Sequence, residues 1–160
     1  MKKTTVLLTL WLIGCWPLAL SGGGTPRPAY EALAAPPRGD AVPWAALQLF
    51  WSDERCVPPD HPDSNYGMAR AELLLRVPVP QANVHRMEAE RADLGRAAQE
   101  YEEVLRRYLP LNEYGFPRFH LILLGMGADG HTASLFPGNR KLSATSRWVS
   151  TPLVGKLGAR

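Results

Sequence analysis

Three apolar segments of this sequence each run directly into a loop of glycine and polar residues. The three segment–loop pairs are residues 18–20 with 21–25, 45–51 with 52–55, and 119–124 with 125–131. Stretches with the three- and four-residue periodicity of helices lie between them, most clearly over residues 94–108. Strands that alternate with helices are typical of the α/β class. We therefore expect an open, mainly parallel, Rossmann-like sheet with flanking helices.

The three loops are far apart in the chain, but this fold class would bring them together in space. Ligands of open α/β sheets bind in the crevice beyond the carboxyl ends of the strands. Each of the three loops follows the carboxyl end of its strand. The sequence therefore predicts one pocket to which all three loops contribute.

Shorter elements are expected around these pairs. Two consecutive prolines at 36–37 should end a helix over residues 29–33, and Ser64 should cap the helix that follows it. Short strands are expected at residues 83–87 and 148–150, and a helix is expected to start near His131. The strand at 119–124 is nearly continuous in apolar residues, which predicts burial on both faces of the sheet.

Composition is that of a folded domain and excludes several classes of protein. The 160 residues are 46% hydrophobic and 21% charged, close to the globular average, which excludes a disordered tail, a collagen-like fibre and a multi-span membrane protein. The length fits one domain. Two cysteines, Cys15 and Cys56, cannot form a disulfide framework. The histidines and cysteines lack the spacing of a local metal motif, so we expect no metal.

Positive charge is concentrated at the end of the chain. Residues 1–130 hold 13 basic and 15 acidic side chains, whereas residues 131–160 hold five basic and none acidic, giving the net charge of +3. A nucleic-acid-binding surface would be denser in basic residues and interleaved with aromatics. We expect a solvated basic surface and no nucleic-acid partner, with a basic lining for an anionic substrate as the alternative.

The first loop has the composition of an anion-binding loop. Gly22 and Gly23 would allow backbone N–H groups to approach phosphate oxygens, and the helix that follows adds the positive end of its dipole. Ser21 and Thr25 can donate through their hydroxyl groups. An ordinary glycine turn between strand and helix is the alternative.

The second loop holds two carboxylates and a guanidinium group. Arg55 can bind a phosphate through two parallel hydrogen bonds. It can equally form a structural ion pair with Asp53 or Glu54. The residues of this loop alone favour the ion pair.

The third loop is the most informative of the three. Gly125, Gly127 and Gly130 have the spacing of a dinucleotide-binding loop, but no acidic residue follows Asp129 to hold a ribose. Asp129 and His131 lie two residues apart, and a histidine oriented by a carboxylate is a suitable general base near neutral pH. The loop therefore favours a catalytic His131 oriented by Asp129, with a structural histidine and a dinucleotide-binding loop as the alternatives.

These segments resemble the signature segments of a known enzyme family. Residues 18–26, residues 50–58 with His61 and residues 64–66, and residues 123–137 resemble those of the 6-phosphogluconolactonases, within the glucosamine-6-phosphate isomerase/6-phosphogluconolactonase superfamily. The resemblance covers roughly residues 18–160. It implies an α/β sheet that is incomplete at both ends relative to the family, because the family usually extends further in both directions.

The resemblance implies a reaction and a role for each candidate residue. The family hydrolyses 6-phospho-D-glucono-1,5-lactone to 6-phosphogluconate in the oxidative pentose phosphate pathway without a cofactor, so the partner would be a phosphorylated sugar lactone. His131 would deprotonate the attacking water and Asp129 would orient His131. The substrate and its phosphate would be bound by Ser21, Gly22, Gly23, Thr25, Asp53, Arg55 and Gly127. The oligomeric state is not predicted.

Two alternative functions stay open at this stage. The related deaminases and isomerases carry an acidic residue five positions after the histidine, where this chain has Phe136, although Asp53 sits where those enzymes keep a proton-abstracting aspartate. The second alternative is a truncated, non-catalytic remnant with residual sugar-phosphate binding. The family's second phosphate-binding basic residue has no counterpart here.

Residues 1–17 form a signal-like or atypical segment ahead of the domain at residues 18–160. Lys2 and Lys3, the apolar run 6–13 and Cys15 have the form of a lipoprotein signal. The run is too short to span a bilayer, which requires about 20 residues. Because the lactone is made and used inside cells, we expect a cytoplasmic protein, with an exported lipoprotein anchored at Cys15 as the alternative.

Overall fold

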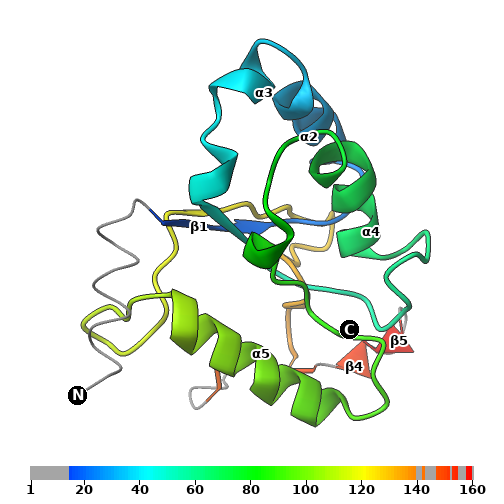
Figure 1. Cartoon of the computed structure of the whole chain (residues 1–160). Coiled ribbons are helices and arrows are strands. Elements are labelled where there is room, and N and C mark those ends of the chain that lie inside the picture. The colour runs from blue at the N-terminus through cyan, green and yellow to red at the C-terminus, as the bar shows by residue number, and fades with distance from the viewer. Residues whose placement is uncertain (1–14, 140–141, 143–146, 152, 155–157, 160) are drawn as a thin grey trace.

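A parallel sheet of three strands lies at the centre of the computed structural model, which describes residues 15–139, 142, 147–151, 153–154 and 158–159. The strands are β1 (Trp16–Leu20), β2 (Leu47–Trp51) and β3 (Leu121–Ile122), in the order β2-β1-β3 (Figure 1). This order and direction confirm the predicted open parallel α/β sheet.

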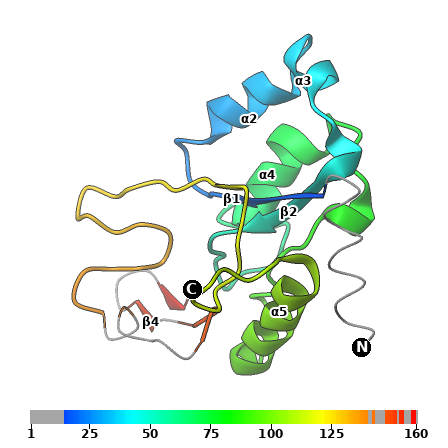
Figure 2. The ribbon, with the colours of Figure 1, turned by 90° about the vertical axis from the view of Figure 1, so that its left-hand side faces the viewer.

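Helices cover the two faces of the sheet unequally. The helices are α2 (Arg27–Ala34), α3 (Arg38–Ala41), α4 (Asn65–Ala69) and α5 (Leu94–Tyr108), with the short turns η1 (Trp44–Ala46), η2 (Arg70–Leu74) and η3 (Gln81–Asn83). In Figures 1 and 2, α2, α3 and α4 lie on one side of the sheet and α5 lies on the other. A two-stranded antiparallel hairpin, β4 (Leu153–Val154) with β5 (Gly158–Ala159), follows near the end of the chain.

The strand register aligns the carboxyl ends of the sheet. β1 and β2 pair without offset, from Trp16 opposite Leu47 to Leu20 opposite Trp51. The hydrogen bonding between β1 and β2 continues one residue beyond β2, where the backbone N–H of Ser52 donates to the carbonyl oxygen of Leu20 at 2.9 Å. β3 pairs with the other edge of β1, and Ala19 lies opposite Ile122. All three loops therefore leave from one edge of the sheet.

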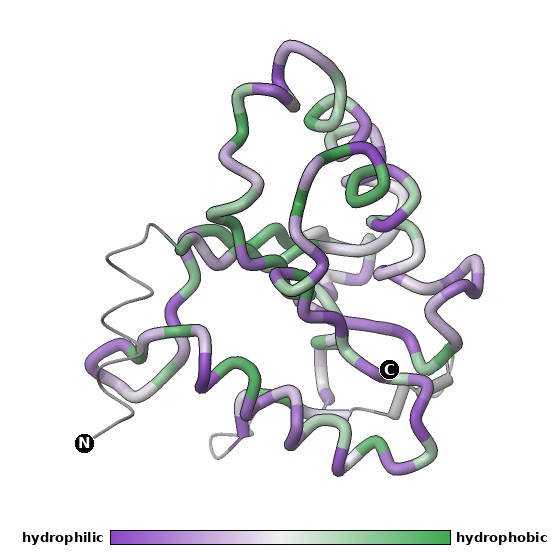
Figure 3. The backbone as a smooth tube through the Cα atoms, in the orientation of Figure 1, coloured by the Kyte–Doolittle hydropathy of each residue, from purple (hydrophilic) through white to green (hydrophobic). Residues whose placement is uncertain are grey.

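The core consists of two clusters of buried side chains, one on each face. Side chains of a strand alternate between faces, so Leu49 and Trp51 pack against α2 and α4, whereas Phe50 packs against Tyr101 and Leu105 of α5. Burying one large apolar side chain contributes about 1.5–3 kcal/mol. In Figure 3 the sheet is mostly hydrophobic, while hydrophilic stretches mark the outer loops.

The helix boundaries agree with the sequence signals. α2 ends at Ala34, shortly before the two prolines, and α5 has the predicted bounds. The Ser64 hydroxyl accepts a hydrogen bond from the backbone N–H of Gly67 at 3.0 Å, as expected for the cap of α4. Asp93 caps α5 in the same way, through the backbone N–H of Arg96.

The third strand is the element that the sequence predicts least well. Only two residues of the predicted strand 119–124 form β3, and Leu121, Ile122 and Leu124 are 49%, 48% and 59% exposed. The prediction of burial on both faces was wrong. Within the described residues β3 pairs with β1 alone, and α5 packs on the Phe50 cluster instead.

Three shorter elements also differ from the prediction. Residues 83–87 form a single bridge, between Val84 and Leu49, rather than a strand. Residues 148–150 are not a strand, because the Glu102 carboxylate accepts the backbone N–H groups of Trp148 and Val149 at 3.0 and 3.1 Å. Residues 132–139 form a Thr132–Leu135 bridge and turns, not a helix.

The start of the sheet lies within the predicted N-terminal segment. β1 begins at Trp16, one residue after Cys15, so residues 16–17 belong to the sheet. The basic and apolar residues of the signal-like pattern lie outside the described residues. In the part of the chain that is described, no helix is long and apolar enough to cross a membrane.

Candidate active site

The first loop and the segment after the second loop are in close contact. A Cβ atom on Gly22 would lie 1.7 Å from Oδ1 of Asn65, so a side chain at this position would displace that amide. A Cβ atom on Gly125 would lie 3.8 Å from Oγ of Ser21, which brings the third loop against the first. The register and these contacts together produce the predicted convergence of the loops.

Asp53 joins the second and third loops. Its Oδ1 accepts a hydrogen bond from Nδ2 of Asn65 at 3.1 Å, and its Oδ2 accepts one from Oγ of Ser134 at 2.6 Å. Nδ2 of Asn65 also donates to the backbone carbonyl of Asp53 at 2.9 Å. Asp53 is 9% exposed, and its carboxylate accepts hydrogen bonds from groups within the protein rather than from solvent.

Glu54 fixes the second loop to the start of α4. Its carboxylate accepts hydrogen bonds from the backbone N–H groups of Arg55, Asn65 and Tyr66 at 2.7, 2.7 and 2.8 Å, and from Oγ of Ser64 at 3.2 Å. Burial raises the pKa of Glu54, and these hydrogen bonds oppose that shift. The backbone on which Arg55 sits is therefore held in place.

Arg55 does not form the ion pair that the second loop alone favoured. Within the described residues its side chain pairs with neither Asp53 nor Glu54, and its Nε is buried without a hydrogen-bond partner. A buried donor left unsatisfied costs about 1–3 kcal/mol. Arg55 can therefore gain a hydrogen bond from an anion that enters the site.

The third loop forms the predicted histidine–carboxylate pair. Nδ1 of His131 lies 2.5 Å from Oδ1 of Asp129, and this contact lowers the pKa of Asp129. An ionised carboxylate can only accept, so the proton of the neutral imidazole is on Nδ1. The lone pair is then on Nε2, which is the arrangement that a general base requires.

Gly127 and Phe136 enclose the imidazole. A Cβ atom on Gly127 would lie 2.2 Å from Cε1 of His131, and the Gly127 N–H donates to the His131 carbonyl at 2.8 Å. The Phe136 ring stacks on the imidazole with centroids 4.3 Å apart and planes inclined by 21°. Gly127 thus has a packing role that its predicted contact with substrate did not include.

The first loop leaves its backbone donors accessible. Ser21 is held by Tyr30, whose hydroxyl accepts from the Ser21 N–H at 3.0 Å and donates to its carbonyl at 2.8 Å. Gly23 has a φ of +85° that favours glycine, and both Gly23 and Thr25 are exposed. No side chain caps the start of α2. Pro26 and Pro28 have no N–H, so the start of α2 can offer an anion only the backbone N–H groups of Arg27 and Ala29.

Asn65, Ser134 and the capping role of Glu54 were not predicted. The N-cap Ser64 could have suggested a carboxylate near the start of α4, but no sequence pattern pairs residues 53 and 134. The described residues contain no group of three or more His, Cys, Asp or Glu side chains placed to hold a metal ion.

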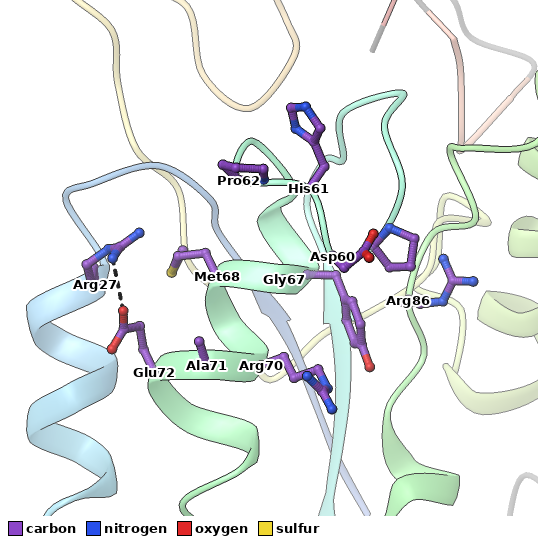
Figure 4. Close-up of a pocket in the computed structure, with 12 residues that line it drawn as sticks. Arg27, Asp60, His61, Pro62, Gly67, Met68, Arg70, Ala71, Glu72 and Arg86 are labelled. Carbon is purple, nitrogen blue, oxygen red and sulfur yellow. Dashed lines mark hydrogen bonds and ion pairs between the residues drawn. The ribbon is translucent and has the colours of Figure 1, made fainter.

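A groove of about 720 Å³ lies beside the starts of α2 and α4 (Figure 4). Figure 4 shows the Arg27–Glu72 ion pair on one side of it and Arg86 on the other. His61 lines this groove, but none of the nine predicted site residues does. The predicted site and the groove are therefore separate features of the surface.

Comparison with known proteins identifies relatives over most of the chain. The family model described as glucosamine-6-phosphate isomerases/6-phosphogluconolactonase matches residues 13–153. The chain is 49% identical over 133 residues to a 6-phosphogluconolactonase of Synechocystis sp., covering 83% of this chain and 54% of that protein. It is 43% identical to the 6-phosphogluconolactonase of Nostoc sp. over 86% of this chain and 55% of that one. The chain thus spans about half the length of these curated relatives.

Solved structures of similar proteins share the fold. The 6-phosphogluconolactonase of Trypanosoma brucei superposes with a TM-score of 0.77 at 32% identity, covering 96% of this chain and 67% of that one. The Thermotoga maritima 6-phosphogluconolactonase gives 0.77 at 30% identity, covering 98% and 66%. A monomeric glucosamine-6-phosphate deaminase, 19% identical with a TM-score of 0.61, shares the fold alone.

Proposed function

The chain belongs to the glucosamine-6-phosphate isomerase/6-phosphogluconolactonase family, and on that premise we propose that it hydrolyses 6-phospho-D-glucono-1,5-lactone to 6-phosphogluconate, a step of the oxidative pentose phosphate pathway. The observation that carries the proposal is the His131–Asp129 pair at the carboxyl edge of the sheet. The pair leaves Nε2 of His131 as a proton acceptor, and the reaction needs one proton acceptor and no redox group.

The proposed mechanism is general-base hydrolysis of an ester. Nε2 of His131 removes a proton from water as the water oxygen attacks the lactone carbonyl carbon. The bond from that carbon to the ring oxygen breaks when the tetrahedral intermediate collapses, and the imidazolium returns its proton to the ring oxygen. Asp129 stabilises the imidazolium between these steps. Backbone N–H groups of the glycine loops are suited to stabilise the intermediate oxyanion.

Arg55 and the first loop would bind the phosphate of the substrate. The buried Nε of Arg55 without a partner and the uncapped start of α2 offer donors of the kind that phosphate oxygens accept. Ser21, Gly22, Gly23 and Thr25 form the loop that connects β1 to α2. The Asp53 carboxylate accepts hydrogen bonds from Asn65 and Ser134, so Asp53 would position the loops around the substrate rather than contact the substrate directly.

The stacking of Phe136 on His131 favours hydrolysis over deamination or isomerisation. The related deaminases and isomerases shuttle a second proton with an acidic residue five positions after the histidine. At the corresponding position Phe136 offers only an aromatic face. Asp53, the other candidate base, already accepts two hydrogen bonds.

The test compares His131→Asn with the parent chain in lactone hydrolysis, read as the excess over spontaneous hydrolysis. We expect the variant to keep its thermal melt and its affinity for 6-phosphogluconate, while kcat/KM falls about 100-fold or more. A variant with parental turnover would show that another group is the base.

Binding measurements separate hydrolysis from the non-catalytic alternative. If the parent chain shows no hydrolysis above the spontaneous rate but binds 6-phosphogluconate, and if Arg55→Ala abolishes that binding, the chain is a sugar-phosphate-binding remnant. If it neither hydrolyses nor binds, the proposal fails.

A cytoplasmic location belongs to the same proposal, because the phosphorylated lactone is produced and consumed inside cells. The Cys15 side chain is half-buried and hydrogen bonds to Gln48, and burial raises the pKa of its thiol. Cells fed labelled palmitate should leave the protein unlabelled. Label that disappears in Cys15→Ser but persists in Cys56→Ser would establish the lipoprotein alternative.

A further inference from the structure

The loop that carries His131 needs an attachment to the rest of the protein. Several of its hydrogen bonds close the loop on itself, such as that from Oγ1 of Thr132 to the carbonyl of Gly125 at 2.9 Å. β3, which leads into the loop, is short and exposed. Bonds within a loop set its shape but not its position relative to other loops.

Ser134 extends from this loop into a buried position. It is 8% exposed, whereas its neighbour Leu135 is 44% exposed. Ala133, just before it, has a φ of +49°, the left-handed region that residues other than glycine seldom adopt. The strained backbone at Ala133 thus coincides with the inward turn that brings Oγ of Ser134 within 2.6 Å of Oδ2 of Asp53.

Asp53 is a rigid point of attachment. It lies two residues beyond β2, a strand that is buried along its whole length. Its other carboxylate oxygen accepts from Asn65, which is 2% exposed. The Asn65 side chain packs against Gly22, and its backbone N–H donates to Glu54 at 2.7 Å. Movement of Asp53 would therefore disturb the buried side chains of Asn65, Glu54 and Ser134.

We propose that Ser134 is a positioning residue, which fixes the His131 loop to the end of β2 through Asp53. The inference rests on the proposed function, because it takes His131 as the base. Asn65 and Ser134 donate to different carboxylate oxygens of Asp53, so Asp53 acts as an acceptor that aligns the loops. Ser134 lies three residues after His131, so loss of the Ser134–Asp53 hydrogen bond moves the imidazole relative to Arg55.

The test compares Ser134→Ala with Ser52→Ala. The Ser52 hydroxyl also donates an intramolecular hydrogen bond near the same strand end, to the carbonyl of Leu20 at 3.0 Å, but among the described residues it forms no hydrogen bond with the third loop. In lactone hydrolysis by the full chain, Ser134→Ala should lower kcat about 10- to 100-fold, the cost of a misplacement near 1 Å. KM should change little, because Arg55 and the first loop stay in place. Ser52→Ala should keep kcat near the parental value.

Three further variants test whether Ser134 acts through Asp53. Ser134→Thr keeps the hydroxyl and should recover most of kcat, whereas Ser134→Cys keeps the volume with a weaker donor and should recover less. Asp53→Ala combined with Ser134→Ala should lower kcat no further than the more severe single change, because each single change already removes the Ser134–Asp53 hydrogen bond. Additive losses would contradict the proposed tie.

Amide hydrogen exchange keeps the inference separate from the proposed function. Ser134→Ala should speed amide exchange of residues 127–135 while leaving β1 and β2 protected, whether or not the chain hydrolyses the lactone. If the parent chain is inactive but shows this response, the proposed function is refuted, whereas the positioning role of the Ser134–Asp53 hydrogen bond is retained. If Ser134→Ala does not fold, Ser134→Cys replaces it in the same measurement. Parental exchange in the loop together with parental kcat would overturn the proposal.

Discussion

The absence of a side chain at Gly127 admits the His131 imidazole. A Cβ atom there would lie 2.2 Å from Cε1 and 2.3 Å from Nδ1 of that ring. The close approach of the ring is therefore the reason for glycine at this position in the loop.

Gly127→Ala should displace the imidazole from Asp129 and reduce lactone hydrolysis about 10- to 100-fold, with a small change in thermal stability because the loop is largely exposed. Gly95→Ala in α5 is the matched control, since a Cβ atom on Gly95 would lie 3.4 Å from Oδ1 of Asp93, an ordinary contact away from the three loops. Steady-state kinetics and thermal melts of both variants check the expectation. Equal activity in the two would mean that the loop adjusts around the new methyl group.

Arg55→Ala should act mainly on substrate binding, because a phosphate contact persists from the ground state to the transition state. We expect KM to rise about 10-fold or more, the loss of one charge-assisted hydrogen bond of about 1.5–3 kcal/mol. Arg55→Lys should recover only part of this, since Lys lacks the planar pair of donors. Titration with inorganic phosphate provides a readout independent of turnover, and parental phosphate affinity in Arg55→Ala would exclude this role.

At the scale of elements, the sequence predicts well what local patterns determine. Strands β1 and β2 and helix α5 follow from apolar runs and helical periodicity, and the Ser64 cap follows from residue type. The exposure of β3 could not be predicted, because an apolar run does not reveal which elements cover it. The Ser134–Asp53 bond joins residues 81 positions apart, so it depends on tertiary structure that no local signal contains.

The exposed edge of β3 predicts self-association. Unpaired strand edges with apolar side chains are common sites of intermolecular pairing, and Leu121 and Ile122 are about half exposed. Ile122→Lys should reduce concentration-dependent association seen by light scattering. Leu75→Lys, a similar change at a residue that is 65% exposed near η2, should not. Equal light scattering by both variants would show that the chains associate through a surface other than the edge of β3.

At the scale of the whole molecule, a partly buried histidine on the α5 face of the sheet makes the fold sensitive to acid. On the α5 face, the His85 ring stacks on Phe50 with centroids 4.7 Å apart and lies 4.3 Å from the Tyr108 ring. Nε2 of His85 lies 2.6 Å from Oε1 of Gln48. Burial lowers the pKa of His85 from 6.5 to about 4, so the native protein holds this ring neutral over a range in which the unfolded chain would protonate it.

The consequence is a loss of stability in mild acid. A histidine whose pKa is lower in the folded state contributes stability that is complete above the unfolded value of 6.5 and is lost as the pH falls toward 4. The melting temperature of the parent should therefore fall between these two values more steeply than that of His85→Phe, which keeps an aromatic ring and cannot titrate. Because His85 is only partly buried, solvent should moderate the effect. Taking the difference between the two proteins cancels the other titrating groups, including Glu54, whose raised pKa acts in the opposite direction. Parallel pH profiles would show that the ring is protonated equally in the folded and unfolded states, and that the Phe50 cluster accommodates the charge.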